Sequence, residues 1–141
     1  MPDFAVRVRG AKGRSWRSPR RLVAVYLGLW VFALVVFFLM DPTDAMGYAL
    51  LFHWLLLPIA AFVISLRIGE LVRRDGRMWL LPLALGLLYM LADFLTFRLA
   101  NMLAFDKINL PQWDLFFIGA AISALGLLIG RLLGRRRSKP A

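Results

Sequence analysis

The sequence predicts an all-α integral membrane protein, a four-helix bundle with four transmembrane helices and both termini in the cytoplasm. Hydrophobic residues make up 61% of the 141 positions, whereas a soluble domain has roughly 45–50%. These residues gather in four long runs, and about 20 apolar residues are enough to cross a bilayer core. The charged residues lie mainly between the runs, and they alternate in sign from one connection to the next.

The charge distribution predicts the topology. All of the 18 basic residues except Arg98 and Lys107 lie before the first run, between the second and third, or from the end of the fourth run onward. Since cytoplasmic segments of membrane proteins carry an excess of Lys and Arg, these three segments are expected inside, in a bacterial inner membrane. The net charge of +10 therefore needs no nucleic-acid partner. Anionic lipids at the cytoplasmic face are the expected partners of the basic segments.

The first span is expected at about 22–40, after a basic cytoplasmic tail at 1–21. It contains no charge, and it exceeds the apolar stretch of about 7–15 residues that a signal peptide contains. A retained helix is therefore predicted. The short turn at 41–44 that follows forces the first two helices to be antiparallel neighbours.

The second and third spans are expected at about 45–66 and 78–101, joined by a charged cytoplasmic turn. The second span contains His53 and Pro58. A proline within a span removes a backbone hydrogen bond, which membrane helices tolerate when a neighbouring group satisfies the freed carbonyl.

The fourth span is expected at about 115–133, followed by a basic tail at 134–141. Small residues recur along it at spacings of three and four, which places them in one stripe: Gly119, Ser123, Gly126 and Gly130. The last two form a GxxxG motif, and such stripes let membrane helices approach closely. Packing within the chain is favoured over packing against a second copy, and Leu127 is expected to matter less than the glycines.

Asp93 and His53 form the expected intramembrane polar pair. Each lies about eight residues, or roughly 12 Å, from the outer end of its span, and the two spans are antiparallel. Tyr89 and Thr96 share a helix face with Asp93 and are its possible support. The pair predicts either a proton or cation relay or an interhelical hydrogen bond that fixes packing, and the second is favoured.

Arg98 and Asn101 lie near the outer end of the third span. Extension of the Arg98 side chain to the membrane surface is the favoured interpretation. The alternative is that both side chains contact an anionic group such as a lipid phosphate.

Catalytic signatures are missing from the sequence. There is no H-E-x-x-H, G-x-S-x-G or phosphate-binding loop, and the chain has one histidine and no cysteine. We therefore expect no catalytic residue, no metal site and no cofactor. The favoured function is that of an accessory or scaffold subunit that contacts a larger membrane partner or a second copy. The alternatives are an oligomeric proton- or ion-coupled transporter or channel using Asp93 and His53, and a lipid-headgroup binder at the outer interface.

Overall fold

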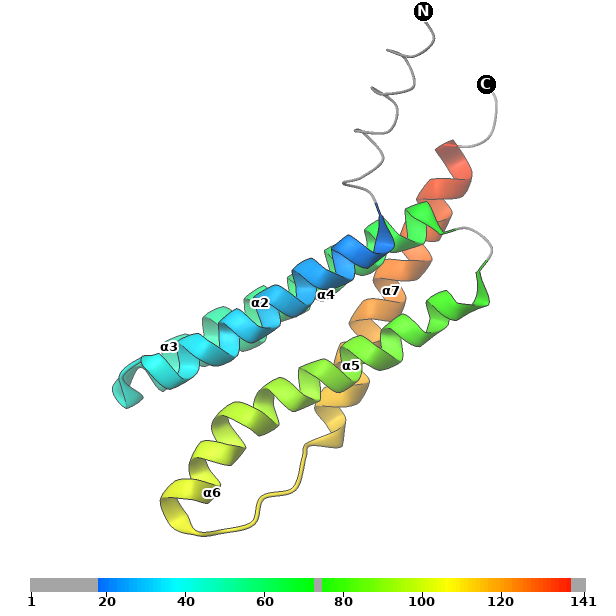
Figure 1. Cartoon of the computed structure of the whole chain (residues 1–141). Helices are drawn as coiled ribbons and strands as arrows, with labels where there is room; N and C mark the ends of the chain where they lie inside the picture. Colours follow the sequence, from blue (N-terminus) through cyan, green and yellow to red (C-terminus); the bar gives the residue numbers. More distant parts are fainter. Residues whose placement is uncertain (1–17, 73–74, 138–141) are drawn as a thin grey trace, which may run out of the picture.

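The computed structural model describes residues 18–72 and 75–137. Within these ranges every regular element is helical, and no strand occurs. Four helical stretches are long and apolar enough to cross a membrane: Pro19–Leu39, Pro42–Leu71, Gly76–Phe105 and Trp113–Arg137. The predicted all-α class with four apolar helices is confirmed, and it suggests a multi-pass membrane protein (Figure 1).

Helix α2 (Pro19–Leu39) forms the first stretch. Ser18 caps it, because its hydroxyl accepts a 3.3 Å hydrogen bond from the backbone N–H of Arg21. Pro19 occupies a first-turn position, where the missing N–H costs no helical bond. After the helix ends at Leu39, Asp41 caps the next turn, η2 (Pro42–Asp44), and the chain reverses direction.

The second stretch continues through α3 (Ala45–Tyr48), a π-helical segment η3 (Ala49–Leu56) and α4 (Leu57–Leu71). In the π-helical register the backbone N–H of Leu57 donates to the carbonyl of Phe52. The next residue, Pro58, has no N–H, so the carbonyl of His53 lacks the donor that this register would give it. The hydroxyl of Tyr89 supplies that donor at 2.9 Å. A side chain of a neighbouring helix thus supplies the donor that Pro58 lacks.

The third stretch consists of η4 (Gly76–Trp79), α5 (Leu80–Asp93), the π-helical segment η5 (Phe94–Arg98) and α6 (Leu99–Phe105). Asp106 ends it in the left-handed conformation, with φ of 51°. Residues 106–112, which we call the returning segment, then run back along α6. Helix α7 (Trp113–Arg137) therefore begins well short of the tip of α6 (Figure 1).

Helix α7 packs closely against α4 and α5 through its small residues. A Cβ atom on Gly126 would lie 2.6 Å from the carbonyl oxygen of Phe62 in α4, and one on Gly119 would lie 2.9 Å from Cβ of Tyr89 in α5. The hydroxyls of Ser123 and Ser65 hydrogen-bond at 2.7 Å. The small-residue stripe therefore lies against helices of the same chain.

Leu127 differs from its expected minor role. Its side chain is 1% exposed and belongs to the central apolar cluster. The GxxxG spacing identifies which backbone approaches α4, but it does not show that the residue between the glycines also faces inward.

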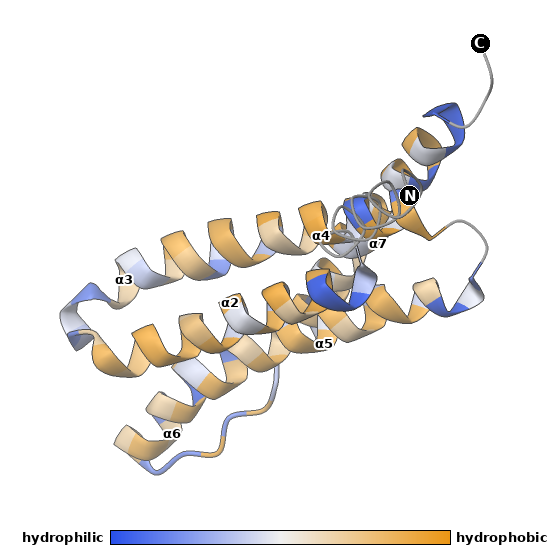
Figure 2. Cartoon of the chain, turned by 45° about the horizontal axis from the view of Figure 1, so that its top comes forward, coloured by the Kyte–Doolittle hydropathy of each residue, from blue (hydrophilic) through white to orange (hydrophobic). Residues whose placement is uncertain are grey.

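The two ends of the bundle differ in charge. The basic end contains the start of α2, the connection between α4 and α5, and the end of α7: Arg20, Arg21, Arg67, Arg77, Arg131, Arg135, Arg136 and Arg137. The acidic end contains the η2 turn, the returning segment and the first turn of α7, with Asp41, Asp44, Asp106 and Asp114. Between the ends, apolar residues cover the long helices (Figure 2).

Candidate functional site

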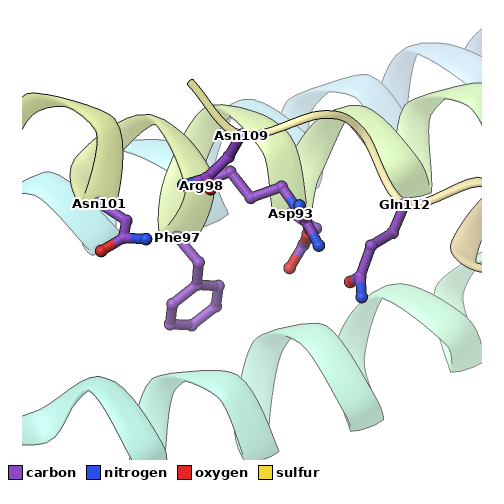
Figure 3. Close-up of a pocket in the computed structure, with 6 residues that line it drawn as sticks. All are labelled: Asp93, Phe97, Arg98, Asn101, Asn109 and Gln112. Carbon is purple, nitrogen blue, oxygen red and sulfur yellow. The ribbon is translucent and has the colours of Figure 1, made fainter. Parts of the chain in front are cut away.

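The candidate site lies at the acidic end, where the returning segment faces η5. Its centre is an ion pair, in which Nε of Arg98 donates to Oδ2 of Asp93 at 3.1 Å. Nη1 of Arg98 also donates to the backbone carbonyl of Leu110 in the returning segment. Figure 3 shows the two charged side chains together with Gln112 close to Asp93.

The π-helical segment explains why Asp93 and Arg98 meet. Five residues separate them, and in a regular α-helix this spacing places two side chains about 140° apart. Residues Phe94–Arg98 are π-helical instead, and a π-helix brings residues five apart to the same side. The spacing of a regular α-helix therefore gives no indication that these two side chains meet.

A pocket of about 480 Å³ surrounds the ion pair and is lined by Asp93, Phe97, Arg98, Asn101, Asn109 and Gln112. The side chains of Asp93 and Arg98 are 14% and 25% exposed. Within the described chain, Oδ1 of Asp93 and Nη2 of Arg98 make no hydrogen bond. The pocket thus offers one free carboxylate oxygen, one free guanidinium nitrogen and three carboxamides.

An apolar pocket of about 420 Å³ adjoins the polar one. Its lining is Phe37, Phe38, Met40, Pro42, Ala45, Phe97, Ala100, Asn101, Ala104 and Phe105. Phe97 and Asn101 line both pockets. The ring of Phe97 also packs edge-on against Phe37 at 5.1 Å. Polar and apolar surfaces therefore meet across one pair of shared side chains.

His53 lies at the edge of this site. Its ring contacts that of Phe97, a residue of the lining, with centroids 6.5 Å apart. The ring also stacks on that of Tyr89 with centroids 4.7 Å apart, and Nε2 is buried without a hydrogen-bond partner in the described chain. The expected hydrogen bond between His53 and Asp93 is absent from the described residues, since the Asp93 carboxylate bonds Arg98 instead.

Tyr89 and Thr96, the possible support of Asp93, make no hydrogen bond to its carboxylate in the described structure. The hydroxyl of Tyr89 donates to the carbonyl of His53. Thr96 is 1% exposed, and its hydroxyl donates to the backbone carbonyls of Ala92 at 2.6 Å and of Asp93 at 3.3 Å. Neither residue lines the polar pocket.

Sequence reasoning identified Asp93, Arg98 and Asn101 but not the rest of the polar lining. Asn109 and Gln112 come from the returning segment, and their carboxamides in an otherwise apolar connection were an available signal. Their position beside Asp93 depends on the segment folding back, which residue spacing does not reveal. Among the described residues, no group of three or more His, Cys, Asp or Glu side chains is placed to hold a metal ion.

No family model, no curated protein and no solved structure matches this chain.

Proposed function

We propose that this chain is a non-catalytic inner-membrane protein that binds a zwitterionic phospholipid, with a phosphoethanolamine headgroup, at its acidic end. The observation that carries the proposal is that the polar pocket around the Asp93–Arg98 pair shares Phe97 and Asn101 with an apolar pocket. A polar cavity beside an apolar one fits an amphipathic ligand. The accessory role expected from the sequence fits this proposal, since the chain would act by binding a lipid.

The charges of the pocket support a zwitterion over a purely anionic headgroup. Guanidinium groups recognise phosphate oxygens well, and Arg98 retains an unused nitrogen for this purpose. An anionic headgroup would also meet the carboxylate of Asp93, which repels it. An ammonium group removes this conflict, because it donates hydrogen bonds to a carboxylate.

The carboxamides and the apolar pocket supply the remaining contacts. Asn101, Asn109 and Gln112 each offer both donors and an acceptor to a phosphate ester. The apolar pocket beyond Phe97 provides a surface for the first part of an acyl chain. The ligand would thus span both pockets across Phe97 and Asn101.

The proposed topology places the site in the outer leaflet. The basic end carries the arginines that the positive-inside rule assigns to the cytoplasm, so the acidic end faces outward. A proton relay through His53 and Asp93 receives less support, because the two side chains share no hydrogen bond in the described structure.

Lipid binding to the purified full chain in detergent tests the proposal. Native mass spectrometry would compare phosphatidylethanolamine with phosphatidylglycerol, and free phosphoethanolamine would separate headgroup binding from lipid binding. We expect the binding that depends on Arg98 to favour phosphatidylethanolamine over both. Arg98→Gln should weaken this binding about tenfold, since a charge-assisted hydrogen bond is lost. Asp93→Asn should shift the preference towards phosphatidylglycerol, because the repelling carboxylate is removed.

Two matched controls lie at the same end, outside both pockets. Lys107→Gln and Asp44→Asn each remove one exposed charge there, and both should leave the lipid preference unchanged. Equal effects of the control and pocket variants would overturn the proposal. So would an Arg98→Gln variant that weakens the binding of both lipids equally.

A further inference from the structure

A third pocket lies at the basic end, between the start of α2, the end of α4 and the start of α5. Its volume is about 540 Å³. Its lining is mostly apolar: Pro19, Arg20, Val23, Ile68, Val72, Asp75, Arg77, Met78, Leu80, Leu81 and Ala84. Neither the small-residue stripe nor the Asp93 site includes any of these residues.

The two arginines of this pocket are available to a ligand. Arg20 and Arg77 are exposed, and neither side chain makes a hydrogen bond or ion pair in the described ranges. Oδ1 of Asp75, the acidic residue in the lining, accepts a 3.0 Å hydrogen bond from the backbone N–H of Arg77, so Asp75 caps the η4 turn. The pocket thus combines an apolar wall with two unpaired guanidinium groups.

We propose that this pocket binds an anionic phospholipid, whose phosphate lies at Arg20 and Arg77 and whose acyl chain covers the apolar wall. Charge complementarity selects the headgroup, because basic pockets between membrane helices attract anionic lipids. The apolar wall selects a lipid over free phosphate, to which it offers no contact. Trp79, 43% exposed beside the pocket, is typical of the headgroup level.

This inference is independent of the proposed function. The two sites lie at opposite ends of the helices and share no residue. The two sites also differ in the headgroup that they prefer. Arg20 and Arg77 give this pocket an excess of positive charge, whereas the opposite charges of Asp93 and Arg98 cancel at the other site. Either site can therefore fail its test while the other passes.

Lipid titration of the purified full chain in detergent provides the first test. We expect phosphatidylglycerol to bind more tightly than phosphatidylethanolamine at this site. Arg20→Gln and Arg77→Gln should each weaken phosphatidylglycerol binding about tenfold. The matched control is Arg67→Gln, which removes an exposed basic residue at the same end outside the pocket. An effect of Arg67→Gln equal to those of the pocket variants would overturn the proposal, since it would indicate nonspecific attraction.

Photo-crosslinking in phosphatidylglycerol-containing vesicles identifies the occupant directly. Ala84 is exposed and lines the pocket, so a benzophenone side chain placed there can reach a ligand. A covalent adduct with the mass of phosphatidylglycerol, reduced in the Arg20→Gln, Arg77→Gln double variant, supports the proposal. A crosslink to this chain's own residues 1–17, to a second copy or to another protein would contradict it.

Discussion

The hydroxyl of Tyr89 donates a 2.9 Å hydrogen bond to the backbone carbonyl of His53. In the π-helical register, residue 58 would donate its N–H to this carbonyl, but Pro58 has no N–H. One side chain of the third stretch thus completes the backbone of the second. In this chain, Pro58 is therefore matched by a hydroxyl on a neighbouring helix.

Replacing Tyr89 by Phe should leave this buried carbonyl unpaired and destabilise the protein by about 1–3 kcal/mol. The cost should fall in a Pro58→Ala background, because alanine restores an N–H in the helix. Denaturation in mixed detergent micelles would measure both. Tyr26→Phe is the matched control: its hydroxyl is buried without a partner in the described chain, so its loss should be neutral or stabilising. Equal costs for the two hydroxyls would contradict this account.

Adding a methyl group at Gly126 should separate α7 from α4. The new Cβ would lie 2.6 Å from the carbonyl oxygen of Phe62, so we expect Gly126→Ala to cost about 1–3 kcal/mol through overpacking. Gly47→Ala serves as the control, since no atom lies within 4 Å of its added Cβ. The same unfolding measurement in micelles applies, and a harmless Gly126→Ala would mean that the two backbones are not in close contact.

The described contacts predict different couplings for Asp93 in double-mutant cycles. His53→Leu and Asp93→Leu should be only weakly coupled, since the two side chains share no hydrogen bond. Asp93→Leu and Arg98→Leu should instead be coupled, because removing both charges avoids an unpaired charge. Unfolding free energies of the single and double variants decide this. Strong coupling between His53 and Asp93 would restore the pairing expected from the sequence.

The cap of η2 should depend on pH. Hydrogen bonds from the backbone N–H and the hydroxyl of Thr43 hold the pKa of the Asp41 carboxyl below its ordinary value. Its contribution to stability is therefore present above the unfolded-state pKa and is lost as pH falls through the folded-state pKa. NMR titration of the carboxyl carbon should show a lower pKa in wild type than in Thr43→Val. An unchanged pKa would show that the cap does not form.

The topology can be tested with fused reporters. Fusions at the N-terminus, at Asp75 and after Lys139 should all report the cytoplasm, whereas a fusion at Lys107 should report the outer side. A periplasmic signal from any of the first three positions would contradict the four-span topology.

The sequence was sufficient to predict the four helices, because a long apolar run can adopt few structures other than a helix. It also pointed to Asp93, Arg98 and Asn101, since charge and carboxamide groups are costly in hydrocarbon. It missed the Asp93–Arg98 pair because α-helical spacing does not apply to Phe94–Arg98. It missed Asn109 and Gln112 because their place depends on the path of the returning segment.

That path makes the bundle uneven in height. The third stretch has 30 residues, whereas α7 has 25 and begins well short of the tip of α6 (Figure 1). About 20 residues of helix cross a bilayer core, and α2 with 21 residues and α7 with 25 both reach that length. Because non-helical backbone at membrane depth must be buried in protein or reached by water, the returning segment is expected to lie beyond the hydrocarbon core. The extra length of the third stretch is then expected to project from the membrane with it, and water can reach the backbone of residues 106–112 there.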